Sequence, residues 1–117
     1  MLTEFGKELR KLRIDNNEKL MDMAERLGKS SAFISSVEVG KKSPPSKLED
    51  AIIALYGLVD TAAERLRVAA DRSRELFTLQ PQSLVARDTA GLLARKINTL
   101  SDDQLERIRS IIGGEQD

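Results

Sequence analysis

The sequence lacks both cysteine and histidine among its 117 residues. Without cysteine, the chain forms no disulfide bond, no cysteine metal site and no cysteine nucleophile. Without histidine, it lacks the most common general base and the most common metal ligand. We therefore expect no enzymatic activity, no metal and no cofactor.

Aromatic residues are scarce, and neither sign of charge is in excess. Aromatic residues make up 3% of the chain, so a core must be built from aliphatic side chains, which here predict an all-α fold. Hydrophobic residues (40%) and charged residues (32%) are typical of a globular chain. The 19 basic and 19 acidic residues give a net charge of zero, so any nucleic-acid surface must come from local clustering. No apolar run has the length of a membrane span or the form of a signal peptide, and we expect a cytoplasmic protein with no membrane partner.

Apolar residues recur at helical spacing along most of the chain. Helices are expected over residues 3–16, 18–27, 31–39, 47–56, 61–74, 83–99 and 102–112. Three of them begin at a capping-box pattern, a serine or threonine followed three residues later by glutamate or glutamine. These pairs are Ser46 with Glu49, Thr61 with Glu64, and Ser101 with Gln104.

The second and third expected helices meet at a single glycine. Gly28 lies where the second helix should end, and Ser30 is a ready N-cap for the next. Two helices of about two turns each, joined by a three- to four-residue turn, are typical of a helix-turn-helix. We expect the helix that follows Ser30 to enter the major groove of DNA.

The chain is expected to divide into residues 1–58, a DNA-binding domain, and residues 59–117, a helical region for dimerisation or partner binding. The helices of the second region are too few to bury all their apolar stripes, so a two-fold dimer interface is expected there. Residues 75–80, which Pro81 follows, are expected to be extended and to form one short strand.

Residues 20–45 resemble the phage-repressor/Cro-like (Xre-type) helix-turn-helix family, and the resemblance extends over residues 5–57. The residues that carry it are Met23, Ala24, Leu27, Gly28, Ser30, Ile34, Ser35, Glu38, Gly40, Lys41 and Pro44. The resemblance implies a five-helix, lambda-repressor-like DNA-binding domain that usually dimerises on a palindromic operator. The start of residues 61–74 corresponds to the fifth family helix.

The resemblance also implies which residues contact bases. By position, these are Ser31, Ala32, Ser35 and Ser36. Serine bonds to several base edges, and an alanine methyl contacts a thymine methyl. None of the four is an arginine, asparagine or glutamine capable of bidentate readout, so DNA shape or loop contacts are expected to supply part of the specificity.

Phosphate contacts are better provided for, because lysines cluster between residues 29 and 47. The expected phosphate-contacting residues are Lys19, Lys29, Ser30, Lys41, Lys42, Ser43 and Lys47. Lys19, Asn17 or backbone amides have to replace a family glutamine, since Leu20 stands at its position and cannot bind phosphate. Glu38 matches a family glutamate with a structural role, and Arg10 is the expected partner.

These patterns lead to one expected function and one alternative. The first is a dimeric transcriptional repressor that binds double-stranded operator DNA through residues 30–39. The alternative is the antitoxin of a toxin-antitoxin pair, which binds a toxin protein through its C-terminal half and represses its own operon.

Overall fold

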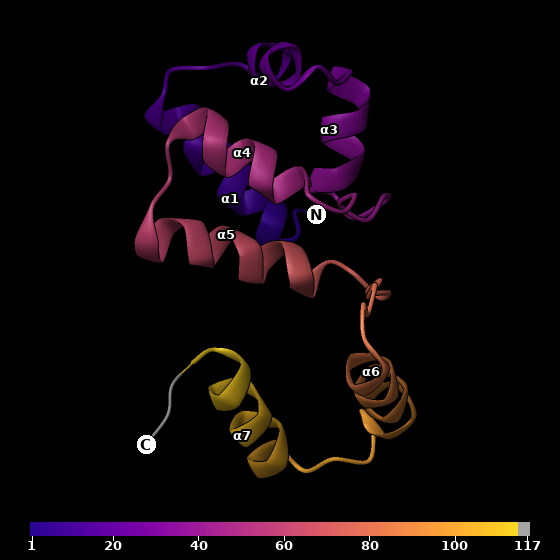
Figure 1. Ribbon diagram of the computed structural model, residues 1–117. Coiled ribbons are helices and arrows are strands. Elements are labelled where there is room, and N and C mark those ends of the chain that lie inside the picture. The colour runs from indigo at the N-terminus through magenta and orange to yellow at the C-terminus, as the bar shows by residue number, and fades with distance from the viewer. Residues whose placement is uncertain (115–117) are drawn as a thin grey trace. The chain divides into compact units, whose positions relative to one another are not determined.

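The computed structural model describes residues 1–114 and is helical throughout its regular parts (Figure 1). The helices of this range are α1 (Glu4–Asp15), α2 (Leu20–Leu27), α3 (Ser31–Glu38), α4 (Leu48–Tyr56), α5 (Asp60–Arg72), α6 (Leu84–Lys96) and α7 (Asp102–Ile112). The predicted all-α fold is therefore confirmed. The short strand predicted near residues 75–80 is wrong, because nothing between residues 1 and 114 forms a strand with which it could pair.

The chain forms two compact units, an N-terminal unit (Met1–Phe77) and a C-terminal unit (Thr78–Asp117). The predicted domain boundary follows residue 58, whereas the first compact unit continues through α5 to Phe77. The reason is packing: α5 lies against both α1 and α4.

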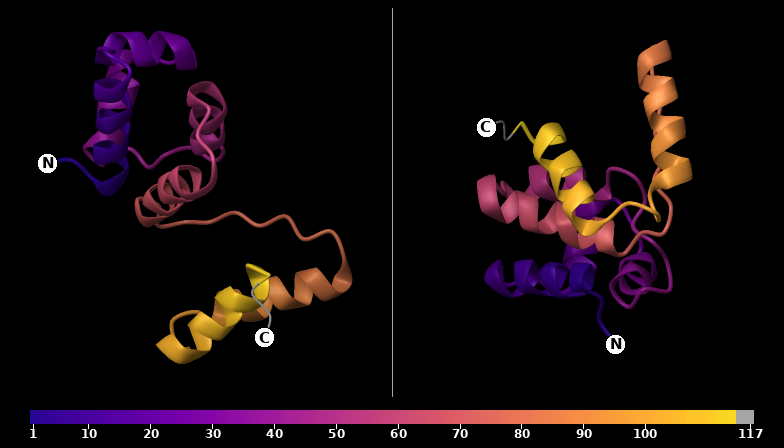
Figure 2. Two further views of the ribbon diagram at one scale, coloured as in Figure 1. Left: turned by 90° about the vertical axis from the view of Figure 1, so that its left-hand side faces the viewer. Right: turned by 90° about the horizontal axis from the view of Figure 1, so that it is seen from below.

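The N-terminal unit is built from α1 to α5 around one core, and its helices are seen from two further directions in Figure 2. Besides the contacts of α5, α2 packs against α3 and α4, and α1 packs against α3. The buried apolar residues are Phe5, Leu9, Met23, Ala24, Ile34, Val37, Leu48, Ile52, Leu66, Ala69 and Ala70. Every helix of the unit contributes to this list, so each one is fixed by burial of its apolar face.

Of the helix caps in the structure, one was not predicted, one confirms a predicted capping box and one contradicts another. Thr3 is the N-cap of α1, with its hydroxyl accepting from the Gly6 N–H at 3.0 Å. The capping box of Ser101 and Gln104 at α7 is confirmed. The one predicted at Ser46 is wrong, because the N-cap position of α4 is Lys47, in a left-handed conformation with φ 71°.

The capping box predicted for Thr61 and Glu64 is also wrong. The N-cap of α5 is Val59, and no side-chain hydrogen bond closes that end. Gly57 ends α4 with φ 64°, and α5 begins at Asp60, one residue before the expected start.

The C-terminal unit consists of α6 and α7, joined by a short connection. Ser83 and Ser101 cap the two helices, each accepting a hydrogen bond from the backbone three residues later. No residue of this unit is buried as far as Gly114. Large apolar side chains are exposed instead, namely Leu79, Leu84, Val85, Leu92, Ile97, Ile111 and Ile112. Across the described part of the whole chain, none of the helices combines the length and the apolar character that crossing a membrane requires.

Candidate nucleic-acid interface

The turn between α2 and α3 has the form that the sequence predicted. Gly28 closes α2 in a left-handed conformation with φ 68°, and the Lys29 N–H donates to the Ala24 carbonyl at 2.9 Å. Ser30 then caps α3, its hydroxyl accepting from the Phe33 N–H at 3.0 Å. Because both helix ends are satisfied within residues 28–30, the angle between the two helices is set by local chemistry.

The end of α3 is fastened to α1 through Glu38. Its buried carboxylate forms an ion pair with Arg13, and Arg13 also donates to the Met23 sulfur at 3.5 Å. The Glu38 carbonyl accepts from the Thr3 N–H at 2.9 Å and from the Thr3 hydroxyl at 3.2 Å. Gly6 faces this carbonyl so closely that a Cβ atom would overlap it. Side chain and backbone of one residue therefore hold α3 in place.

The predicted partner of Glu38 was Arg10, and that prediction is wrong. Phe5, Leu9 and Arg13 are spaced four residues apart, so Arg13 lies on the buried face of α1. Arg10 lies on the exposed face of the same helix.

The residues predicted to contact bases lie on the outer side of α3. Ala32 and Ser35 are exposed, while Ser31 and Ser36 are half-buried. The inner side carries Ile34 and Val37, both fully buried. At the end of the helix, the Ser36 carbonyl accepts hydrogen bonds from the backbone N–H groups of Lys41 and Lys42, at 2.9 and 3.2 Å, which ties the start of the following loop to α3. The outer side of α3 thus carries small side chains that let another surface approach the backbone closely.

All of the residues predicted to contact phosphate are exposed. They are Lys19, Lys29, Ser30, Lys41, Lys42, Ser43 and Lys47. Two of their hydroxyls already have partners: that of Ser30 caps α3, and that of Ser43 donates to the Ser73 carbonyl at 3.5 Å.

The segment from Lys29 to Lys47 has a strongly positive surface. It exposes four lysines, and its single acidic residue, Glu38, is buried against Arg13. The buried pair takes this carboxylate out of the surface field, so nothing acidic within the segment offsets the four ammonium groups. The first turn of α3 has no acidic side chain either, which leaves the positive end of its helix dipole uncompensated.

Phe33 brings two of these lysines to one place. The Lys29 ammonium lies 5.4 Å from the centre of its ring, and the Lys42 ammonium lies 5.7 Å from it. Each is within reach of a cation–π attraction. Lys29 belongs to the turn before α3 and Lys42 to the loop after it. The Phe33 ring therefore brings together two ammonium groups from opposite ends of the helix.

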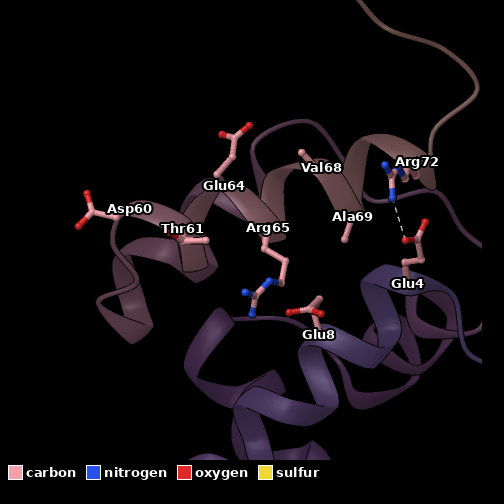
Figure 3. Close-up of a pocket in the computed structure, with 9 residues that line it drawn as sticks. All are labelled: Glu4, Glu8, Asp60, Thr61, Glu64, Arg65, Val68, Ala69 and Arg72. Atoms are coloured by element: carbon pink, nitrogen blue, oxygen red, sulfur yellow. Dashed lines mark hydrogen bonds and ion pairs between the residues drawn. The ribbon is translucent and has the colours of Figure 1, made fainter. Parts of the chain in front are cut away.

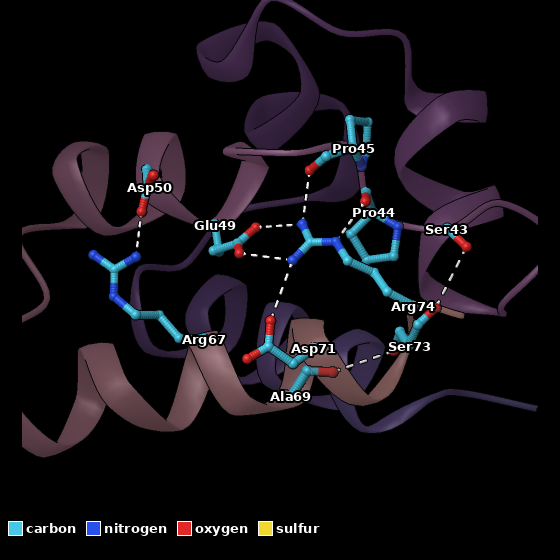
Figure 4. Close-up of polar contacts among 10 residues, drawn as sticks. All are labelled: Ser43, Pro44, Pro45, Glu49, Asp50, Arg67, Ala69, Asp71, Ser73 and Arg74. Atoms are coloured by element: carbon cyan, nitrogen blue, oxygen red, sulfur yellow. Dashed lines mark hydrogen bonds and ion pairs between the residues drawn. The ribbon is translucent and has the colours of Figure 1, made fainter. Parts of the chain in front are cut away.

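The loop between α3 and α4 is held by a residue that the sequence did not single out, Arg74 (Figure 4). Its guanidinium donates to the carbonyls of Pro44 at 2.9 Å and Pro45 at 2.7 Å. It also forms a two-point ion pair with Glu49, at 2.8 and 2.6 Å. Burial raises the pKa of Glu49, but the hydrogen bonds from Arg74 and from the backbone outweigh it, so the net pKa lies below its usual value.

A second polar cluster fastens the start of α2 to the end of α4. The Tyr56 hydroxyl donates to Glu18 at 2.5 Å, and Arg26 donates to the same carboxylate at 2.6 Å. Burial, together with the bond to Glu18, raises the pKa of Tyr56 to about 12. The hydrogen bond from Tyr56 in turn lowers the pKa of Glu18. No local sequence pattern indicates this cluster, because Tyr56 is 38 positions from Glu18 along the chain.

A groove of about 560 Å³ between α1 and α5 has the opposite character (Figure 3). Its lining residues are Glu4, Glu8, Asp60, Thr61, Glu64, Arg65, Val68, Ala69 and Arg72. Four carboxylates and two arginines are among these residues, and Arg72 is paired with Glu4 at 3.0 Å. A polyanion is disfavoured in such a groove, so the basic surface around α3 is the better candidate for nucleic acid. No group of three or more acidic side chains between residues 1 and 114 is arranged to hold a metal ion.

Comparison with known proteins found no matching family model, no matching curated protein and no matching solved structure.

Proposed function

We propose that the chain is a sequence-specific DNA-binding regulator of transcription, with a lambda-repressor-like helix-turn-helix domain formed by α1 to α5. One observation carries the proposal. The small outer side chains of α3 are flanked by four exposed lysines, and no exposed acidic residue interrupts the segment from Lys29 to Lys47. Base edges are read by an exposed helix face, and phosphates are held by the cations beside it.

In this proposal α3 lies in the major groove, with Ala32 and Ser35 nearest the bases and Ser31 and Ser36 at the margins of the contact. The lysines bind phosphate on either side. Serine and alanine discriminate bases less strongly than bidentate side chains, so DNA shape supplies part of the specificity.

Two copies of the domain on a palindromic operator supply the rest. Half-sites read by such dimers lie about 34–36 Å apart, one helical turn of DNA. The exposed apolar residues of α6 and α7 support a dimer, because two helices without a buried residue gain stability only by association. Repression follows when the dimer covers a promoter.

The direct test is fluorescence anisotropy of the full-length protein with a labelled duplex from the region upstream of its own gene. We expect saturable binding at low salt that weakens as salt rises, with a log–log slope of about −0.9 for each phosphate neutralised. Absence of binding at low salt contradicts the proposal.

A charge reversal separates the two kinds of contact. Replacing Lys41 and Lys42 by glutamate should weaken binding to all sequences alike and reduce the slope by about one per lysine. The matched control replaces Arg87 and Arg95 of α6 by glutamate, which changes the net charge equally. Ser35→Asn, by contrast, should change which sequences are selected from a pool of random duplexes. Identical effects from both kinds of variant contradict the division of roles.

The second candidate function is an antitoxin that binds a toxin protein through its C-terminal unit. The exposed apolar side chains of α6 and α7 favour it too, since another protein can cover them as well as a second copy does. A tagged chain recovered from its native host distinguishes the candidates. A stoichiometric partner encoded beside it favours the antitoxin, and self-association alone favours the repressor.

A further inference from the structure

We infer that Arg74 is a positioning residue for the proposed DNA interface: it holds the loop between α3 and α4 in the conformation that presents Lys42 and Lys47 to phosphate. The inference rests on the proposed function and assigns part of that function to a residue outside the helix-turn-helix.

The first argument is the geometry of the guanidinium. Arg74 makes five hydrogen bonds, two to loop carbonyls, two to Glu49 and a longer one to Asp71 at 3.5 Å. A guanidinium has five N–H donors, so this one is fully used. Its side chain is 11% exposed. Arg74 is therefore occupied by the protein itself and is not a phosphate ligand.

The second argument concerns what the loop lacks. Pro44 and Pro45 have no N–H groups, so neither donates a backbone hydrogen bond, and the one backbone bond to their carbonyls in the described chain runs from the Leu48 N–H to Pro45 at 3.1 Å. Arg74 supplies donors to these two residues, and the Ser43 hydroxyl reaches the neighbouring Ser73 carbonyl. The centre of the loop is thus fixed from the segment that follows α5.

The third argument is the placement of the lysines. Lys42 precedes Ser43 and the two prolines, and Lys47 follows them, so both flank the carbonyls that Arg74 holds. Lys47 adopts a left-handed conformation, φ 71°, that its residue type does not favour. Glu49 lies in the first turn of α4, so its ion pair with Arg74 holds the backbone just after Lys47. Lys29 is independent of this arrangement, since the turn after α2 holds it.

Full-length Arg74→Gln is compared with wild type by anisotropy on the same upstream duplex. We expect binding about tenfold weaker at low salt and a salt slope smaller by one to two, since about two phosphate contacts are lost for every sequence alike. Arg72→Gln is the matched control, because it removes an equal charge two residues away, at the end of α5, while leaving the loop bonds intact. It should bind as wild type does.

Arg74→Lys separates positioning from direct contact. Lysine keeps the charge but cannot reproduce the planar set of bonds to two carbonyls and a carboxylate. If Arg74 positions the loop, lysine does not restore affinity. If Arg74 contacts phosphate itself, lysine restores it and the inference is overturned. Thermal melts confirm that each variant is folded at the temperature of the binding measurement, and Arg74→Lys serves if Arg74→Gln does not fold.

A double-mutant cycle gives the readout that mere destabilisation cannot produce. Lys47→Gln should weaken binding less in the Arg74→Gln chain than in wild type, whereas Lys29→Gln should cost the same in both. Equal costs for both lysines in both backgrounds overturn the inference alone. Failure of the wild-type chain to bind DNA at low salt overturns the proposed function, and the inference with it.

Discussion

The two units of the chain form helices equally well but bury very different amounts of apolar surface. Serine caps α3 in the N-terminal unit and also α6 and α7 in the C-terminal unit. The N-terminal unit has eleven buried apolar residues, and the described part of the C-terminal unit has none. Good helix ends are therefore common to both units, and a core is not.

This difference shows which part of the chain is stable by itself. A buried large apolar side chain contributes about 1.5–3 kcal/mol, and the N-terminal unit has several. Isolated helices shorter than about 12–15 residues are marginal in water, and α6 and α7 have 13 and 11 residues. Burial fixes the position of α3, whereas no buried residue of the described C-terminal unit fixes α6 or α7 in the same way.

Cutting the chain between the units tests this comparison and should give the largest effect. We expect residues 1–77 to melt cooperatively, with a midpoint within a few degrees of the full chain's main transition, since the whole core is retained. Residues 78–117 alone should show little helix by circular dichroism at low concentration and gain it as concentration rises. A cooperative, concentration-independent transition in the smaller fragment contradicts the contrast.

The next largest effect concerns the two kinds of ion pair. Glu38→Gln leaves Arg13 buried without its counter-charge and should lower the free energy of unfolding by about 3–5 kcal/mol. Glu106→Gln removes the partner of Arg109 in α7, where both side chains are exposed, and should change stability within experimental error. Urea denaturation of the full chain measures both, and equal losses contradict the account of α3 given above.

A glycine in each unit offers a smaller, matched test. Gly6 in α1 faces the Glu38 carbonyl, so Gly6→Ala must push α1 and α3 apart and should destabilise by about 1–3 kcal/mol. Gly91 in α6 has only the end of Arg95 nearby, at 3.5 Å from an added Cβ. Gly91→Ala should therefore increase helicity and stabilise α6 by up to about 1 kcal/mol. The same substitution thus has opposite signs in the two units, and equal signs refute the contrast.

Local signals in the sequence were enough for the helices and for the turn at Gly28. Helical periodicity, a glycine at a helix end and a serine at a helix start each act within one or two turns, so they are visible without knowledge of the fold. The all-α fold and the capping box at Ser101 follow from such signals. The exposure of Ala32 and Ser35 follows as well, since Ile34 and Val37 take the buried face.

Long-range contacts were the part that the sequence did not reveal. Arg74 and Glu49 are 25 positions apart, and no local pattern links them. The spacing of Ser46 and Glu49 predicts a capping box, and nothing in the sequence shows that Arg74 engages Glu49 instead. Arg10 and Arg13 are both basic residues of one helix, and only their phase relative to Phe5 and Leu9 distinguishes the buried one.

The strand predicted near residues 75–80 failed for a related reason. Leu76, Phe77 and Leu79 have the side chains of a strand, but strand formation needs a partner with which to share hydrogen bonds. All three side chains are exposed. β-propensity measures a fit to a half-buried surface, and the described residues offer no such surface there.

The smallest predicted effect is a pH dependence that belongs to the N-terminal unit. Because the net pKa of Glu49 lies below its usual value of 4.5, the folded state favours the ionised form more than the unfolded state does. Its contribution to stability is therefore complete above pH 4.5 and is lost as pH falls through the lowered pKa. We expect the free energy of unfolding of wild type to decline below pH 4.5 and Glu49→Gln to make the decline shallower. Residues 1–77 should show the same pH dependence as the full chain, and a dependence confined to the full chain would place its origin in the C-terminal unit.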